Sequence, residues 1–126
     1  MYTPRRVAIL SAVLVVAVWA GVRAADVTGT WTATFDTQAG EQQYTYQFTV
    51  KGTELTGMAK GSLTGEAKIT DGKVDGQSIS FVEMATFQGM PFRIEYTGTM
   101  ASADEIKFTR KVADIATEPL VAKRVK

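Results

Sequence analysis

The sequence predicts an all-β fold, a closed antiparallel up-and-down barrel of about eight strands. Polar and apolar residues alternate with a period of two along most of the chain, which is the pattern of half-buried strands. Short turns separate these segments, and no connection is long enough for a crossover helix. Because the expected number of strands is even, the last strand can pair antiparallel with the first, which leaves no open sheet edge.

The clearest strand is the segment 28–35, in which Trp31, Ala33 and Phe35 share one face and threonines occupy the other. Its unbroken alternation and its β-branched residues are typical of a half-buried strand. Trp31 is the only tryptophan beyond residue 24. A ring of this size near the start of the first strand can close one end of a barrel.

The other strands follow from the same alternation, and glycine marks several of the turns between them. The predicted strands cover residues 42–50, 55–60, 77–87, 92–100, 105–112 and 120–126, with a further strand around residues 67–69. Gly52-Thr53 suits a two-residue turn that pairs Val50 with Leu55, and Asp75-Gly76 suits a type I′ turn, since glycine accepts the positive φ that both turns need.

Three irregular places are expected between the strands. Asp71-Gly72 is predicted to form a bulge, because the two halves of its strand need one extra residue to face the same way, and the glycine would take the positive φ. Residues 88–91 are expected to turn the chain. Residues 113–119 are expected to form a loop, and the proline at its end would open the last strand.

Residues 1–24 have the features of a secretory signal peptide. Arg5 and Arg6 precede an apolar run over residues 7–22, and Val22-Arg23-Ala24 fits the small-x-small cleavage rule. This run is shorter than the roughly 20 residues that span a bilayer. We therefore expect cleavage after Ala24, a single barrel domain over residues 25–126, and a periplasmic or secreted location. Retention of the leader as a membrane anchor is the alternative.

The composition narrows the possible functions. The 126-residue chain has no cysteine and no histidine, which excludes a thiolate nucleophile, a Ser-His-Asp triad and an imidazole ligand for zinc or haem. The carboxylates are scattered, so we expect no metal, no cofactor and no enzymatic activity. After cleavage 11 basic and 13 acidic residues remain, and this weakly acidic balance gives no reason to expect a nucleic acid or a membrane partner. The domain is expected to be a monomer.

A short motif resembles a known group of barrels. Gly29-Thr30-Trp31 on the first strand, combined with Arg124 on the last, resembles the lipocalin and calycin barrels, and the same stretch also resembles the opening strand of avidin-like barrels. The resemblance implies an exported bacterial lipocalin-like domain in which Trp31 plugs one end and Arg124 packs across it. It also implies a small hydrophobic ligand. The chain departs from these families in lacking a disulfide, room for a C-terminal helix and a second tryptophan to enclose biotin.

Three polar side chains are predicted to face the barrel interior. If Phe87 pairs with Phe92, Glu83 lies opposite Tyr96, and the next hairpin places Tyr96 opposite Arg110. A buried carboxylate and guanidinium are costly unless they are paired or hydrated. Three interpretations stay open: a polar anchor for a ligand that carries a carboxylate or hydroxyl, an internal salt bridge that braces the barrel, or strand ends that simply reach solvent.

The inward-facing residues supply the candidate ligand-binding set and two hypotheses for function. The candidate residues are Tyr44, Tyr46, Phe81, Glu83, Tyr96, Phe108 and Arg110. The first hypothesis is non-catalytic binding of a small hydrophobic or amphiphilic ligand in the interior. The alternative is a periplasmic or secreted protein-interaction or inhibitor domain with a filled core. A connected cavity would favour the first, and a packed interior with an exposed apolar rim would favour the second.

Overall fold

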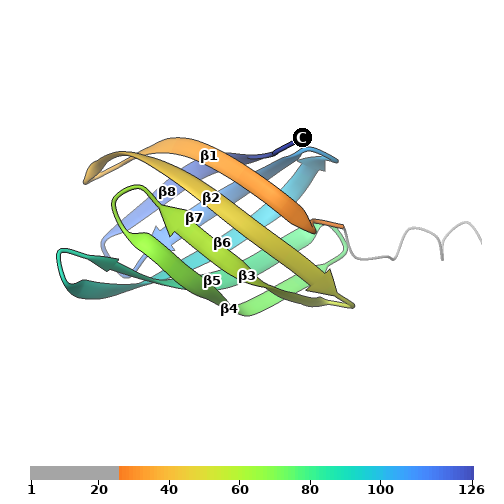
Figure 1. Ribbon diagram of the computed structural model, residues 1–126, viewed down its shortest axis with the longest axis horizontal. Helices are drawn as coiled ribbons and strands as arrows, with labels where there is room; N and C mark the ends of the chain where they lie inside the picture. Colours follow the sequence, from red (N-terminus) through yellow and green to blue (C-terminus); the bar gives the residue numbers. More distant parts are fainter. Residues whose placement is uncertain (1–25) are drawn as a thin grey trace, which may run out of the picture.

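The computed structural model describes residues 26–126, which form a closed antiparallel barrel of eight strands in the order of the chain (Figure 1). The strands are β1 (Gly29–Thr37), β2 (Gly40–Lys51), β3 (Glu54–Gly61), β4 (Gly65–Asp75), β5 (Ser78–Phe87), β6 (Met90–Ser102), β7 (Glu105–Val112) and β8 (Ala116–Arg124). The predicted fold class is therefore confirmed. No helix within this range is long and apolar enough to cross a membrane. The predicted signal peptide and its cleavage site lie outside the described residues.

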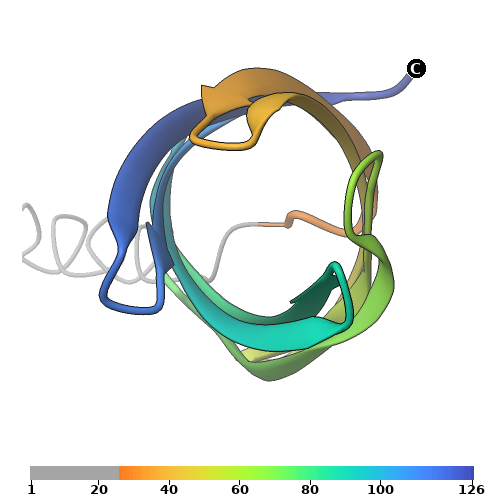
Figure 2. The ribbon, with the colours of Figure 1, turned by 90° about the vertical axis from the view of Figure 1, so that its left-hand side faces the viewer.

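The last strand closes the ring on the first, as the even strand number predicted. Trp31 on β1 lies opposite Arg124 on β8, and Thr32 lies opposite Lys123. The Val125 amide also donates a hydrogen bond to the Thr30 carbonyl at 2.8 Å. Figure 2, a view from one end, shows the strands as a continuous ring.

The up-and-down order gives the barrel two different ends. The turns after β1, β3, β5 and β7 lie at one end, which we call the mouth and which faces the viewer in Figure 2. The turns after β2, β4 and β6 lie at the other end, together with the segment before β1. We call this second end the closed end, because side chains fill it.

The middle and the closed end of the barrel are packed with aromatic rings. Phe81 and Tyr96 stack with their ring centroids 4.3 Å apart. Tyr46 stacks on Phe48 at 5.7 Å, and Phe108 meets Phe81 edge-on at 5.6 Å. All five side chains are at most 2% exposed. Because the strands alternate in facing, these rings fill the interior while polar neighbours face water.

The hairpin between β5 and β6 differs from the prediction. Gln88 and Gly89 alone form the turn, both with positive φ (53° and 78°), and Phe87 pairs with Met90. The prediction of a longer turn was wrong because Gln88, which is not a glycine, takes the first left-handed position of a two-residue turn. Turns with two left-handed residues are favoured in hairpins because their twist matches that of the flanking strands. The register shifts by two residues, so Glu83 lies opposite Ile94 rather than opposite Tyr96.

The last connection is also shorter than predicted. β8 begins at Ala116, so residues 116–119 belong to the strand, and Pro119 lies within it opposite Thr109. The sequence indicated a strand start because proline cannot donate a ladder hydrogen bond. Here the ladder between β8 and β1 includes only Lys123 and Arg124 of β8. The edge of β8 that faces β1 therefore forms no ladder hydrogen bond at Pro119, and a proline is tolerated there.

The β4 bulge is present, but its two residues have exchanged roles. The register shifts between Thr70 and Lys73, and Asp71 has the positive φ of 52°. A Cβ atom on Gly72 would collide with the Leu55 carbonyl. The glycine is therefore needed for close approach of two backbones, and an aspartate tolerates the left-handed conformation.

The hairpin after the bulge is displaced by one residue from its predicted position. Asp75 pairs with Ser78, and the turn consists of Gly76 and Gln77, with φ of 59° at the glycine. The predicted turn at Gly52-Thr53 is confirmed, since Gly52 has φ of 63° and Val50 pairs with Leu55.

Candidate ligand-binding site at the mouth of the barrel

Trp31 fills the closed end of the barrel. Its side chain is fully buried, and its indole Nε1 donates a hydrogen bond to the Val27 carbonyl at 2.9 Å. The Arg124 guanidinium lies over the ring, with its central carbon 4.4 Å from the ring centroid. The structure therefore brings together the two residues that the family resemblance placed at a barrel plug.

Arg124 also joins separate parts of the backbone at this end. Its Nη1 donates to the Thr28 carbonyl at 2.8 Å, and its Nη2 donates to the Asp26 carbonyl at 3.0 Å. Its Nε donates to the Ala103 carbonyl at 3.1 Å. A planar guanidinium can make these bonds and stack on the indole at the same time. The closed end is thus sealed by both packing and hydrogen bonds.

A buried carboxylate accepts hydrogen bonds from two tyrosines in the middle of the barrel. Tyr44 donates to one oxygen of Glu83 at 2.8 Å, and Tyr96 donates to the other at 2.9 Å. Each phenol has only one hydrogen to donate. Tyr46, whose hydroxyl lies 3.0 Å from that of Tyr96, must therefore donate to it, and Thr64, at 2.8 Å, must donate to Tyr44.

Burial raises the pKa of the Glu83 carboxyl above its ordinary value of 4.5. The hydrogen bond from Tyr44, the charge of Arg110 and the hydrogen bond from Tyr96 all lower the pKa, but they do not cancel the effect of burial. Burial likewise raises the pKa of the Tyr44, Tyr46 and Tyr96 hydroxyls, so the phenols stay protonated as donors.

Arg110 interacts with Glu83 only indirectly. Its Nη2 donates to the Tyr44 hydroxyl at 3.1 Å, and its Nη1 forms an ion pair with Glu118 at 3.2 Å. The guanidinium carbon also lies 5.2 Å from the Phe35 ring centroid and 4.9 Å from that of Tyr44. The inward row of polar residues exists, but Tyr44 bridges its two ends, and the ionic partner of Arg110 comes from the segment predicted to be a loop.

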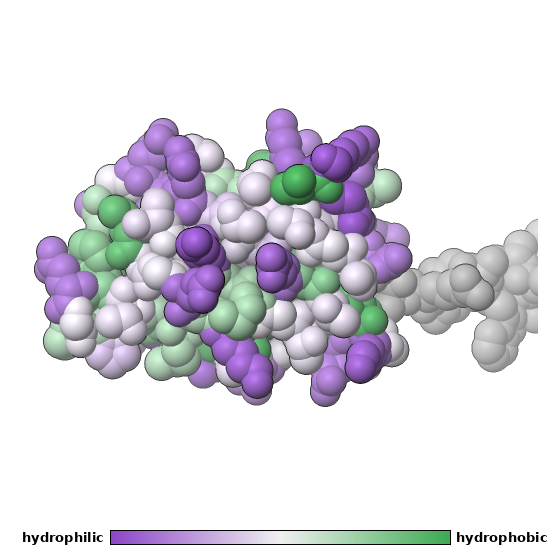
Figure 3. Space-filling model, in the orientation of Figure 1, coloured by the Kyte–Doolittle hydropathy of each residue, from purple (hydrophilic) through white to green (hydrophobic). Residues whose placement is uncertain are grey.

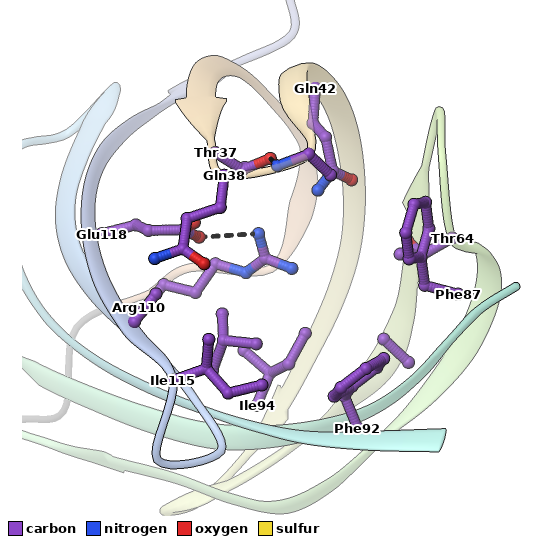
Figure 4. Close-up of a pocket in the computed structure, with 14 residues that line it drawn as sticks. Thr37, Gln38, Gln42, Thr64, Phe87, Phe92, Ile94, Arg110, Ile115 and Glu118 are labelled. Atoms are coloured by element: carbon purple, nitrogen blue, oxygen red, sulfur yellow. Dashed lines mark hydrogen bonds and ion pairs between the residues drawn. The ribbon is translucent and has the colours of Figure 1, made fainter. Parts of the chain in front are cut away.

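A pocket of about 310 Å³ opens at the mouth above this network (Figure 4). Its walls come from the turns after β1, β3 and β7, from the facing ends of β5 and β6, and from residues of β2, β7 and β8. The lining residues are Thr37, Gln38, Ala39, Gln42, Thr64, Ala85, Phe87, Phe92, Ile94, Arg110, Val112, Ile115, Ala116 and Glu118. Most of them are apolar or small, and the Arg110–Glu118 ion pair crosses one side of the pocket in Figure 4.

The structure divides the seven candidate ligand-binding residues between two environments. Arg110 lines the mouth pocket. The other six lie below it, where Tyr44, Tyr46, Glu83 and Tyr96 form the hydrogen-bonded network and the two phenylalanines, Phe81 and Phe108, belong to the aromatic core. Sequence reasoning found the inward faces but not the height of each residue along the barrel axis.

Most of the pocket wall was missed for two reasons. Gln42 and Glu118 are polar residues at inward positions of strands, and a signal for them existed in the alternation: each is two residues from a buried aromatic or aliphatic side chain of the same strand. Ile115 and Gln38 lie in turns, where alternation says nothing about facing. No group of three or more acidic side chains in the described part of the chain could hold a metal ion.

The outside of the barrel is mainly hydrophilic, and the rim of the mouth carries exposed apolar side chains among polar ones. Figure 3 shows charged and polar side chains over much of the visible face, with apolar ones among them toward the mouth at the left. Leu63, Met90 and Ile115 are 41%, 61% and 57% exposed, and they belong to three different turns or strand ends at the mouth. An apolar rim therefore surrounds part of the pocket opening.

The fold and the pocket together define a closed eight-stranded antiparallel barrel with a small-molecule-sized cup at one mouth. Among solved structures it is similar to a de novo designed fluorescence-activating β-barrel, at 19% sequence identity and a TM-score of 0.55, over 78% of this chain and 93% of that chain. It is also similar to EF1p2_mFAP2b, solved bound to DFHBI, at 14% identity and a TM-score of 0.52, over 79% and 94% of the two chains.

No family model matches the sequence, and no curated protein matches it significantly. At 14% and 19% identity, the two structural similarities show the fold alone. The barrel implied by the resemblance is thus established, while membership of the lipocalin or calycin families stays a prediction.

Proposed function

We propose that this protein is an exported, non-catalytic barrel that binds a small, largely apolar molecule in the mouth pocket. The observation that supports the proposal most directly is the pocket itself. Its volume of about 310 Å³ lies at the lower end of the range of small-molecule sites, which are concave and mostly apolar with a few polar groups. The walls of this pocket are likewise mostly apolar, with a few polar side chains.

The filled core defines how a ligand would enter. Aromatic side chains occupy the middle of the barrel, and Trp31 and Arg124 seal the opposite end. A ligand can therefore reach the interior only through the mouth, and it is limited to a compact body of one or two rings. One similar barrel is solved bound to the small molecule DFHBI, which supports the proposal that a barrel of this kind can hold such a ligand.

The binding proposal can be tested with the uncharged fluorescent dye prodan, whose aromatic body is a two-ring naphthalene. We expect a dissociation constant in the micromolar range, which corresponds to a binding free energy of about −8 kcal/mol. Ala116→Phe places a ring in the pocket and should abolish binding, because Ala116 lines the wall and is half-buried. Ala101→Phe is the matched control, since Ala101 is exposed on β6 near the closed end. Equal binding by both variants would place the dye elsewhere and contradict the proposal.

Export is a separate part of the proposal. It is supported by residues 1–24, in which two arginines are followed by an apolar run and then by small residues that fit a cleavage site. Mass spectrometry of the protein recovered from its own host should find an N-terminus at Ala25. A chain that retains Met1 and sits in the membrane fraction would support the anchor instead.

The second candidate function is protein interaction, and the apolar rim favours it. Leu63, Met90 and Ile115 expose apolar area around the mouth, where a protein partner can dock on the turns. Native mass spectrometry of the protein from its host distinguishes the two functions. A bound small molecule supports the carrier, whereas a bound protein that is lost when these three residues are changed to serine supports the interaction domain.

A further inference from the structure

One polar side chain in the wall of the mouth pocket has a buried oxygen without a hydrogen-bond partner among residues 26–126. Gln42 is only 5% exposed, and its Oε1 is buried without a partner among the described residues. A buried carbonyl oxygen without a hydrogen bond is costly, because it has lost its water and gained nothing in return. Gln42 lines the pocket (Figure 4), and rotation about its last side-chain bond is soft. Its amide can therefore turn toward a ligand without a movement of the backbone.

Arg110 contributes a second unused hydrogen-bonding atom to the same pocket. Its Nε is buried without a partner in the described part of the chain, although Nη1 and Nη2 are bonded to Glu118 and Tyr44. Gln42 and Arg110 thus supply at least one acceptor and one donor that the protein itself leaves unsatisfied. Groups of this kind, placed in an apolar wall, select a ligand by its hydrogen-bond pattern.

The two charged side chains that line the pocket, Arg110 and Glu118, balance each other, and Glu83 does not belong to the lining. The positive charge of Arg110 is paired with Glu118, and Glu83 lies just below, bonded to the same tyrosine as Arg110. An anionic ligand would meet two carboxylates and a guanidinium that is already engaged. A cationic ligand would meet the guanidinium itself, and both carboxylates are already engaged, Glu118 with Arg110 and Glu83 with Tyr44 and Tyr96. Burial of a further unpaired charge here would be costly, so the site favours a neutral ligand.

We infer that the mouth pocket recognises an uncharged ligand whose head group carries a hydrogen-bond acceptor and a donor side by side, as a carboxamide or a lactam does, on a compact apolar body. Such a head group forms two hydrogen bonds with the Gln42 amide, one in each direction, and its carbonyl can also accept from Arg110. The inference rests on the proposed function, because it names the ligand class of the same pocket. It replaces the ligand carboxylate or hydroxyl that the inward Glu83 and Arg110 first indicated.

Three ligands of nearly equal shape test this inference: naphthamide, acetylnaphthalene and naphthoate, substituted at the same ring position. They carry an acceptor with a donor, an acceptor alone, and a negative charge. In calorimetric titrations of the protein expressed from the full-length chain, naphthamide should bind about tenfold more tightly than acetylnaphthalene, the value of one hydrogen bond. Naphthoate should bind most weakly of the three.

Gln42→Met removes the amide but keeps the side-chain length, so it should abolish the tenfold preference while both uncharged ligands still bind. Gln43→Met is the matched control, because Gln43 is exposed on the outer face of the same strand, and it should keep the preference. Equal binding of the two uncharged ligands by the unaltered protein would overturn the inference and leave the proposed function standing. Tightest binding of naphthoate would also overturn it, by showing that both buried groups donate. Failure of all three ligands to bind would overturn the proposed function as well.

Discussion

The two ends of this barrel are built from the same eight strands, but they differ in how completely their polar side chains are hydrogen-bonded. At the closed end the Trp31 nitrogen and all three Arg124 nitrogens donate to backbone carbonyls, and the indole and guanidinium stack. At the mouth, Gln42 and Arg110 each keep a buried atom without a partner in the described residues. The polar side-chain atoms of Trp31 and Arg124 at the closed end are all hydrogen-bonded, whereas the mouth keeps one acceptor and one donor that a ligand can use.

Side-chain size explains why the barrel interior is filled in its middle and hollow at the mouth. The inward positions of the middle and closed end carry large rings, including Trp31, Phe48 and Phe81, which fill the space as a small barrel requires. Toward the mouth, inward positions carry alanine at residues 85 and 116. One barrel can therefore be a stable packed core at one end and a binding cup at the other.

The largest difference between the two regions should appear on deletion of a ring. Phe81→Ala should lower the free energy of unfolding by about 4 kcal/mol, because it opens a cavity among Tyr96, Phe48 and Phe108. Phe92→Ala should cost about 1 kcal/mol, since Phe92 is half-buried and faces the pocket. Urea unfolding followed by circular dichroism measures both values. Similar losses would mean that the mouth is packed as tightly as the core.

The polar layer between the two regions gives the next largest effect. Arg110→Met should destabilise by about 3 kcal/mol, because Glu118 is left buried without its cation. Adding Glu118→Gln should restore most of this loss. Adding Glu83→Gln should restore less, since Glu83 keeps its hydrogen bonds from Tyr44 and Tyr96. The opposite order of rescue in urea unfolding would make Glu83 the true ionic partner.

The seal of the closed end should give a smaller loss. Arg124→Ala should cost about 1–2 kcal/mol, through lost stacking on Trp31 and lost bonds to exposed carbonyls. It should also shift the fluorescence emission of Trp31. Arg124→Lys should recover only part of the stability, because an ammonium does not stack as a flat guanidinium does. Unchanged emission and midpoint in both variants would contradict the plug.

The smallest expected effect is a dependence of stability on pH that comes from Glu83. Burial raises its pKa in the folded protein, so the folded state binds this proton more tightly than the unfolded state does. The stability from this proton is complete below pH 4.5, the ordinary pKa, and is lost as the pH rises through the folded-state pKa. The stability of the unaltered protein relative to Glu83→Gln should therefore fall over that window, as urea midpoints would show. A rise would mean that the folded-state pKa is lowered instead.

Hairpin registers show where sequence reasoning succeeds and where it stops. The pairing of Val50 with Leu55 was predicted correctly, because glycine at residue 52 marks its turn. The pairing of Phe87 was displaced by two residues, because Gln88 takes a left-handed conformation that its residue type does not announce. Glu118 was assigned to a loop for a similar reason, since Pro119 obscured the strand around it.

By itself, the sequence determined the strands, their facing and the closure of the ring, because a period of two is a local property that each segment displays independently. It thereby placed Glu83, Tyr96 and Arg110 inside the barrel. Only the tertiary structure decided how deep each inward side chain lies, and so which of them fill the core and which line the pocket. In a closed barrel the strands are tilted and staggered, so the depth of one residue depends on the registers of all the hairpins together. No single segment of the chain contains that information.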